Sequence, residues 1–485
     1  MSRRADGEKL HLNVNILPSG SHPAAWRSPT GRPRGFIDIA LYQEIGRIAE
    51  RGKLDAVFLA DTLALPVDSI GAGPAWSLDP VVILASIAAV TEHVGLIGSA
   101  SATFLPPWTL ARTFLSLDHA SNGRAGWNLV TSSDPTSAFN FSADPLPPKA
   151  QRYEQAAEYV EIVKALWGSW AEDALVADVE SGVFANPDRI EAPNHAGPHY
   201  SVAGALTLPR SPQERPLLVQ AGGSPEGRDL AARHADALFN AQLTLAGAQR
   251  YYCDIKKRAE AYGRSGDDIA VLPGVEITVG ETTAEAWARK DALDDLIPRD
   301  ARIQHFAAHV GIPAEQLDWD EPVPVEFDQL VASSNMFGFV SAINDLHVEE
   351  RPPVGELIRR GGAGHRTLVG SPTEVADSLE EWFEERGADG FNVNIDVFPD
   401  GLERFVALAV PELQRRGLFR REYEGATLRQ RYGVRNLDPL SRPTLELVRI
   451  VRAHKNLVLQ PGQHDAVDRH LDLAGVRVAL RQGGH

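Results

Sequence analysis

The sequence predicts a (β/α)8 barrel, an α/β fold with long insertions at the carboxyl-terminal face of its strands. Three observations favour it: about eight apolar segments have the length of buried strands, helical segments separate them, and polar or glycine-rich residues follow most of them. Strands joined by helical crossovers pair in parallel, and eight such units close into a barrel. A doubly wound open sheet is the alternative, but eight units exceed what most such sheets contain.

The first part of the chain alternates strands and helices in a regular order. Residues 10–17 alternate apolar and polar side chains, as a first strand does. Asp79 and Pro80 mark a helix start, because aspartate caps backbone N–H groups and proline suits the first turn. The expected strands are 10–17, 56–61, 94–101 and 127–132, and the expected helices are 41–52, 79–91, 109–120 and 152–170.

After residue 213 the alternation resumes. The expected strands are 217–221, 237–242, 269–279 and 391–395, and the expected helices are 225–235, 245–262, 283–296, 371–387 and 402–417. Two stretches interrupt the pattern: 171–213, rich in Pro, Gly, Asn and His with a hairpin arm at 200–202, and 298–360, with few clear elements. In a barrel, such insertions build walls and lids over a site at the carboxyl-terminal face.

We therefore expect one barrel domain over residues 1–433, with both insertions, and a C-terminal extension over 434–485. Within the extension, residues 444–458 have helical spacing. The extension either packs on a neighbouring subunit or is partly disordered.

Composition excludes several classes of protein. With 48 basic and 65 acidic side chains the formal net charge is −17, which disfavours nucleic acid and anionic membrane surfaces as partners. The longest apolar stretch, 81–90, falls short of the ~20 residues that span a bilayer, and the N-terminus lacks the apolar core of a signal peptide. Cys253 is the only cysteine, so no intramolecular disulfide forms. We expect a soluble cytoplasmic protein.

Polar residues at strand ends are the candidate site, because barrel sites lie at the carboxyl ends of strands. They offer hydroxyls, amides and one carboxylate, which suit hydrogen bonding to a heteroaromatic ligand better than acid–base chemistry. The alternative is that these residues cap helices. The set comprises Asp61, Ser99, Ser101, Thr103, Asn128, Thr131 to Ser133, Gly222 to Ser224, Asn240 and Gln242.

The loop Gly222-Gly223-Ser224 precedes an expected helix, where backbone N–H groups can hold a phosphate. Tyr153 at a helix start can stack on a ligand or hydrogen-bond to it, and His22 lies in the loop after the first strand beside Trp26 and Arg27. No metal is expected, because the chain lacks His-Glu-x-x-His, and His195 and His199 have no third ligand nearby. A Gly-x-Ser-x-Gly hydrolase elbow is also absent.

Several ordered motifs resemble the family of nitrilotriacetate and dibenzothiophene-sulfone monooxygenases. They are Leu-His-Leu-Asn with Ala-Ala-Trp-Arg-Ser-Pro near the start, Leu117 to Thr131, Pro209 to Gln213, Gln220 to Ser224, Ala388 to Asn392 and Val410 to Tyr423. The resemblance implies a bacterial-luciferase-like TIM barrel that acts as the oxygenase of a two-component system. An NAD(P)H:flavin reductase would supply FMNH2, which reacts with O2.

The resemblance also implies flavin contacts by Asp61, Thr103, Tyr153 and Ser224, with Asn128 as a further position. The glycine loop adds Gly223. Family members commonly carry a histidine four residues before the tyrosine, where this chain has Lys149. A lysine cannot act as a neutral imidazole near pH 7, but it can bind the flavin phosphate. Candidate catalytic residues are therefore His22 and Lys149.

The predicted function is FMNH2-dependent oxygenation of a small organic or xenobiotic substrate, with cleavage of a C–N, C–S or C–halogen bond. We expect a homodimer or homotetramer. Two alternatives stay open at this point: a deazaflavin-dependent oxidoreductase of the same superfamily, and a flavin-binding barrel without catalysis.

Overall fold

The computed structural model describes residues 7–67, 70–75, 78–142, 144–324, 330–331, 334, 336–361 and 364–434. These residues belong to one compact unit. Apart from Val434, the predicted extension over 434–485 lies outside the described residues.

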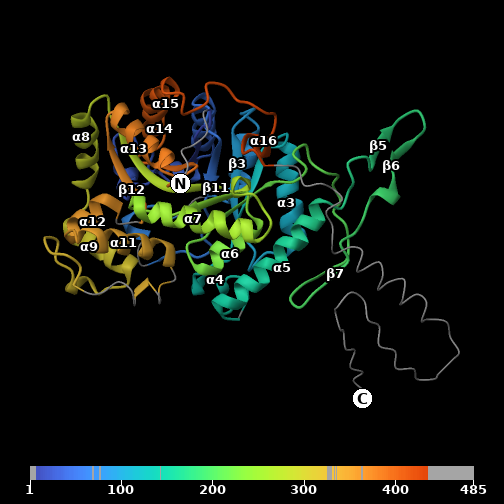
Figure 1. Cartoon of the computed structure of the whole chain (residues 1–485), viewed down its shortest axis with the longest axis horizontal. Helices are drawn as coiled ribbons and strands as arrows, with labels where there is room; N and C mark the ends of the chain where they lie inside the picture. The colour runs from blue at the N-terminus through green and yellow to red at the C-terminus, as the bar shows by residue number, and fades with distance from the viewer. Residues whose placement is uncertain are drawn as a thin grey trace, which may run out of the picture. The chain divides into compact units, whose positions relative to one another are not determined.

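Eight parallel strands of the described chain close into a barrel (Figure 1), which confirms the predicted fold. Strand β13 pairs with β1, and β10 pairs with β11, so the ring has no open edge. In ring order the strands are β1 (His11–Asn15), β2 (Ala56–Leu59), β3 (Gly95–Ser101), β4 (Ala125–Val130), β9 (Leu217–Ala221), β10 (Ala237–Asn240), β11 (Ala270–Val279) and β13 (Gly390–Ile395).

A further strand, β12 (Arg366–Gly370), was missed by the sequence analysis. It pairs in parallel with residues 275–279 of β11, whose earlier residues 270–273 pair with β10. Strand β11 is ten residues long, so its second half extends past β10 and leaves an edge for β12 to cover. Strand β12 therefore forms because it pairs with β11, and its own sequence gives no strong strand signal.

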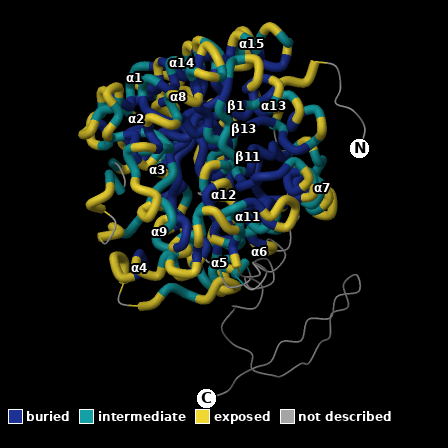
Figure 2. Tube along the Cα trace, turned by 90° about the vertical axis from the view of Figure 1, so that its left-hand side faces the viewer, coloured by how far each residue is buried: buried dark blue, intermediate teal, exposed yellow. Residues whose placement is uncertain are grey.

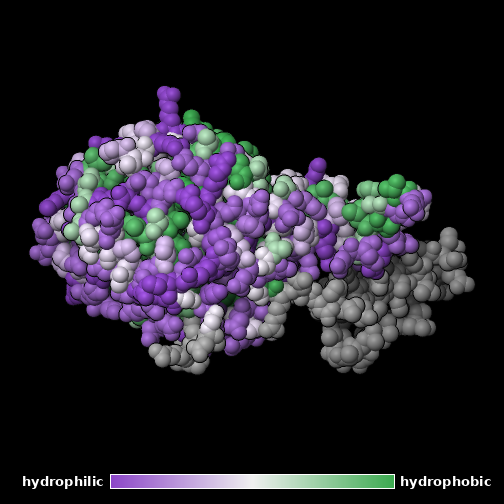
Figure 3. Space-filling view, turned by 90° about the horizontal axis from the view of Figure 1, so that it is seen from above, coloured by the Kyte–Doolittle hydropathy of each residue, from purple (hydrophilic) through white to green (hydrophobic). Residues whose placement is uncertain are grey.

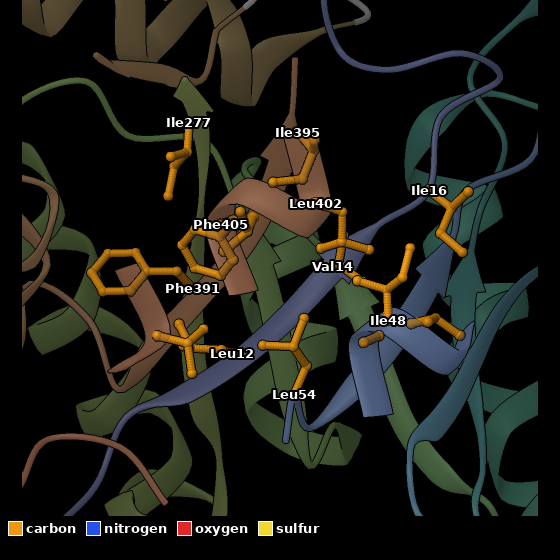
Figure 4. Packing of buried hydrophobic residues seen from close by; sticks show 14 of the residues in the cluster. Leu12, Val14, Ile16, Ile48, Leu54, Ile277, Phe391, Ile395, Leu402 and Phe405 are labelled. Atoms are coloured by element: carbon orange, nitrogen blue, oxygen red, sulfur yellow. The ribbon is translucent and has the colours of Figure 1, made fainter. Parts of the chain in front are cut away.

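The helices cover the outer face of the barrel. Along each strand, side chains that face the helices alternate with side chains that face the barrel interior. Figure 4 shows Leu12, Val14, Phe391 and Ile395 packed with residues of the surrounding helices, and Figure 2 shows β1, β11 and β13 buried beneath them. The helices are α1 (Ile39–Arg51), α2 (Pro80–Ala88), α3 (Pro107–Ala120), α4 (Pro135–Ala138), α5 (Lys149–Trp167), α6 (Pro225–His234), α7 (Leu245–Ala261), α8 (Thr283–Asp294), α13 (Pro372–Glu384), α14 (Asp400–Arg404) and α15 (Val410–Arg415).

The predicted helix start at Asp79 and Pro80 is confirmed, because the Asp79 carboxylate accepts hydrogen bonds from the backbone N–H groups of Val81 and Val82. No helix of the described residues is both long and apolar enough to cross a membrane.

The end of the described chain closes the amino-terminal end of the barrel. Helix α16 (Leu428–Arg431) and Tyr432 join an apolar cluster with inward side chains of the strands, including Ala56 and Ile97. The Tyr432 ring stacks on His11 at 4.5 Å, and its hydroxyl donates to Asn13 Oδ1 at 2.8 Å. We call these residues, Leu428 to Tyr432, the barrel plug.

The first insertion, 171–213, connects α5 to β9 and contains two hairpins. Strands β7 (His195–Ala196) and β8 (Ser201–Val202) form the predicted one, and β5 (Leu175–Asp178) pairs with β6 (Val183–Ala185) to form another, which projects from the barrel (Figure 1). Its exposed apolar side chains, Leu175, Val176, Val179, Val183 and Phe184, make a patch over β5 and β6 (Figure 3).

The second insertion, 298–360, is more regular than the sequence predicts. It contains helices α9 (Arg299–Val310), α11 (Phe337–Glu350) and α12 (Val354–Gly361). These helices bury an apolar cluster of their own, with Phe306, Val340 and Leu357 among its members. The sequence expectation of few elements was wrong, because this cluster stabilises helices that lack strong local start signals.

Candidate active site

Polar side chains gather where β3 and β4 end. Trp127 packs outward against Phe114 and Trp167, so the next residue on β4, Asn128, faces the barrel interior. Asn128 Nδ2 donates to Ser99 Oγ at 2.7 Å, and Asn128 Oδ1 is buried without a partner in the described chain. Thr103 Oγ1 donates to the Thr131 carbonyl at 2.8 Å, which ties the two strand ends together.

Asp61 follows β2, the next strand of the ring. Burial raises the pKa of the Asp61 carboxyl to about 6, and the nearby Asp79 carboxylate raises it further. A backbone hydrogen bond from Thr62 opposes this rise. Asp61 therefore changes its charge close to neutral pH.

The glycine loop after β9 leads into α6, as the sequence predicts. Ser224 is the N-cap of α6, and its hydroxyl oxygen accepts from the Gly227 N–H at 3.2 Å. A Cβ on Gly223 would lie 2.4 Å from the Gly338 Cα, so only glycine allows α11 to lie against this loop. The second insertion thus reaches the carboxyl end of β9, beside an exposed helix start that suits an anion.

Lys149 and Tyr153, on the first turns of α5, meet the same helix start. Lys149 Nζ lies 2.9 Å from Glu226 Oε2 and 5.6 Å from the centre of the Phe337 ring. The Tyr153 hydroxyl lies over Gly227, 3.1 Å from where a Cβ on that glycine would sit. Six predicted positions therefore form two neighbouring groups on the β3–β4–β9 side, and Asp61 extends them to β2. One group is Thr103 and Asn128, and the other is Lys149, Tyr153, Gly223 and Ser224.

His22 is placed elsewhere, in the loop that passes from β1 over the end of β13. A Cβ on Gly20 would collide with the Asp396 carbonyl, so this loop needs glycine there. His22 Nε2 lies 3.0 Å from Asp294 Oδ1, and His22 Nδ1 accepts from the Ala24 N–H. Both ring nitrogens are therefore engaged within the protein. Lys290 Nζ also binds Asp294, at 2.8 Å.

The sequence analysis missed a set of inward-facing polar residues on the opposite side of the ring. Asn15, Glu276 and Asn394 lie on β1, β11 and β13, and Asn15 Nδ2 donates to Asn394 Oδ1 at 2.9 Å. The alternation of polar with apolar residues along 10–17 and 390–395 was the signal that could have revealed Asn15 and Asn394.

A family model described as luciferase-like monooxygenase matches residues 20–390. The chain belongs to the luciferase-like monooxygenase family. Nitrilotriacetate monooxygenase component A of Aminobacter aminovorans is 41% identical, with 90% of this chain and 100% of that protein covered. Dibenzothiophene-sulfone monooxygenase of Rhodococcus erythropolis is 37% identical, with 85% of this chain and 93% of that protein covered.

Two solved structures share the fold. EDTA monooxygenase of Chelativorans sp. BNC1 has a TM-score of 0.73 at 33% identity, covering 88% of this chain and 99% of that one. A riboflavin lyase, solved with a modified FMN and riboflavin, has a TM-score of 0.76 at 27% identity, covering 88% and 96%. The chain is accordingly a flavin-dependent monooxygenase that uses O2, as the sequence predicts.

The residues at the β2–β3–β4–β9 wall fit a flavin. The buried Asn128 Oδ1, 3% exposed as a residue, needs a donor that no described residue supplies. The start of α6 suits an anion, because the Glu226 carboxylate accepts there from Lys149, from the Ser224 hydroxyl and from its own backbone N–H, and a phosphate would take its place. Both features suit a ligand with a polar ring at one end and an anion at the other.

Proposed function

We propose that the chain is the oxygenase component of a two-component system, which takes reduced FMN from an NAD(P)H:flavin reductase. It oxygenates a small organic substrate with O2, and a C–N, C–S or C–halogen bond of the substrate is then cleaved. The relative named as component A supports a separate reductase. The monooxygenase relatives favour this function over the deazaflavin-dependent and non-catalytic alternatives.

One observation carries the proposal: the polar ends of β2, β3 and β4 and the start of α6 follow one another around the ring. Ser224, Lys149 and the first turn of α6 would hold the flavin phosphate. Thr103 and Asn128 would orient the ring, with Asp61 as an acceptor whose charge varies near neutral pH. The Tyr153 hydroxyl would add a contact between the two groups.

When bound, reduced flavin supplies the electrons that activate O2. The chain's residues bind it, orient it and exclude water. Packing of α11 against Gly223 covers the glycine loop from the solvent side. The site contains mainly hydroxyls and amides, and the cations Lys149 and Arg228 lie at the glycine loop, which agrees with anion binding by the protein and chemistry that takes place on the cofactor.

Anaerobic fluorescence titration with FMNH2 tests the cofactor assignment, and oxygen uptake with a flavin reductase and a panel of organic substrates tests the reaction. Ser224→Gly is a suitable variant, because glycine caps a helix nearly as well as serine but lacks the hydroxyl. We expect weaker FMNH2 binding at unchanged thermal stability. A wild-type protein that does not bind FMNH2 would refute the proposed function.

A further inference from the structure

Four polar side chains project into the barrel from β1, β11 and β13: Asn15, Glu276, Asn392 and Asn394. We call them the amide cluster. Strand register places Asn15 opposite Asn394, and Asn394 opposite Glu276. Their neighbours along the strands, Val14, Ile277 and Ile395, belong to the apolar layer under the helices (Figure 4), so the cluster faces inward.

The hydrogen bonds of the cluster are incomplete. Asn15 Nδ2 donates to Asn394 Oδ1, but Asn15 Oδ1 and Asn394 Nδ2 are buried without a partner in the described chain. The two residues are 5% and 1% exposed. If both carboxamides were turned over, one would still bond to the other, so one donor and one acceptor would remain in either case.

Asn392 and Glu276 add further inward-facing polar groups to the cluster. Asn392 lies one inward position before Asn394 on β13, is 1% exposed, and has no partner for either side-chain polar atom in the described chain. Glu276 accepts from Thr367 Oγ1 at 3.3 Å, and burial raises the pKa of its carboxyl to about 7 despite the charge of Lys290. Glu276 can therefore still carry a proton, and donate it, near neutral pH.

Buried carboxamides in folded proteins almost always have hydrogen-bond partners, because an unpaired one costs about 1–3 kcal/mol. Three in one cluster therefore indicate that bound water or a ligand completes the bonds. In the ring order, β11, β13 and β1 lie opposite β3, β4 and β9, which carry the flavin-binding positions. A substrate has to reach the flavin from the space between these two walls.

We propose that the amide cluster binds a carboxamide group of the organic substrate. Such a group places a donor and an acceptor side by side, which matches the free Asn394 Nδ2 and Asn15 Oδ1, while Asn392 and Glu276 lie beside them. The inference rests on the proposed function and adds the substrate class: amides, in place of hydrocarbons.

The test uses the full-length protein and two probes of similar shape, benzamide and isopropylbenzene. Ligand-observed NMR measures their binding with and without FMNH2 under argon. We expect benzamide to bind, and its dissociation constant to rise at least about tenfold in Asn394→Leu, because a donor to the probe is lost. Isopropylbenzene should bind the variant as well as or better than the wild type. Asn15→Leu, on another strand, serves as a second variant if Asn394→Leu does not fold.

A reciprocal control distinguishes the two walls. Asn128→Leu should weaken FMNH2 binding and leave benzamide binding without flavin unchanged, and Asn394→Leu should leave FMNH2 affinity within about twofold. Absent benzamide binding, or binding that Asn394→Leu does not alter, would overturn the proposal. Loss of FMNH2 affinity in Asn394→Leu would also overturn it, by assigning the cluster to the cofactor. Failure of the wild type to bind FMNH2 would refute the proposed function alone, since the benzamide measurement without flavin stands by itself.

Discussion

Asp61 follows β2 at the flavin wall, and its protonation should control cofactor affinity. Its pKa is raised to about 6, so the ionised form, the stronger acceptor, dominates only above that pH. We expect wild-type FMNH2 affinity to rise from pH 5 to pH 7.5. In Asp61→Asn this dependence should shrink to that of the FMNH2 phosphate, which itself titrates near pH 6, with affinity at pH 7.5 lower by roughly 10- to 150-fold. Anaerobic titration across this range checks it, and equal pH profiles would exclude Asp61 from the site.

Lys149 pairs with Glu226 at the helix start, and 43% of each side chain is exposed. A pair so exposed adds little stability, about 0–1 kcal/mol, so Lys149→Met should fold normally. The variant leaves the Glu226 carboxylate unpaired where we place the phosphate. We expect FMNH2 binding to weaken several-fold and reduced riboflavin, which lacks the phosphate, to bind as before.

Glu226→Gln in the Lys149→Met background should restore part of the FMNH2 affinity, because it removes the remaining negative charge. Equal losses for FMNH2 and reduced riboflavin in Lys149→Met would show that Lys149 does not contact the phosphate.

Glu276 should make stability depend on pH in a defined direction. Its pKa is raised from 4.5 to about 7 in the folded state. Below pH 4.5 the proton on Glu276 therefore contributes its full stabilisation of the folded state. This stabilisation is lost as the pH rises through 7. Relative to Glu276→Gln, the wild-type free energy of unfolding should fall by about 3 kcal/mol across this window. Denaturant unfolding at pH 5 and pH 8 measures it, and a constant difference would contradict the assignment.

Among the elements, α11 and the glycine loop depend on each other most closely. Gly223→Ala would place a Cβ 2.4 Å from the Gly338 Cα, and the overlap should cost about 1–3 kcal/mol and displace α11. We expect faster proteolysis within 298–360, with protection by FMNH2 and substrate in the wild type. Gly338→Ala is the matched control, because its Cβ would lie 3.3 Å from Gly223. Cleavage that is equal in both variants would argue against this contact.

The elements that the sequence predicts well are those whose signals are local. Apolar segments between helical segments predict all eight barrel strands, and Asp79 predicts the start of its helix. Strand β12 and the helices of 298–360 depend on partners far along the chain. At the site, Asp61, Asn128 and Ser224 follow from their places near strand ends. Asn394 lies as near the end of β13 and could have been found in the same way. Glu276 lies within the ten-residue strand β11, which is buried on both faces, so only barrel closure decides that it faces inward.

At the scale of the molecule, residues beyond the barrel should be dispensable for folding. The compact unit ends at Arg435, and the two solved relatives cover 88% of the chain. A chain truncated after Arg435 should keep the thermal midpoint and the FMNH2 affinity of the full-length protein. Differential scanning calorimetry and anaerobic titration check this, and a lower midpoint at equal protein concentration would mean that 436–485 support the barrel.

Because the barrel plug lies near residue 432, β1 can complete its contacts only late in synthesis. The inward side chains of β1 meet their partners only when residues near 432 have left the ribosome, and the β1–β13 pairing joins residues almost 380 positions apart. At about 5–20 residues per second, the first strand waits roughly 20–90 s for its second edge and for Tyr432. During that interval the nascent chain exposes unpaired strand edges and apolar side chains. Chaperones that bind nascent chains would therefore have to protect β1 for longer than the other strands.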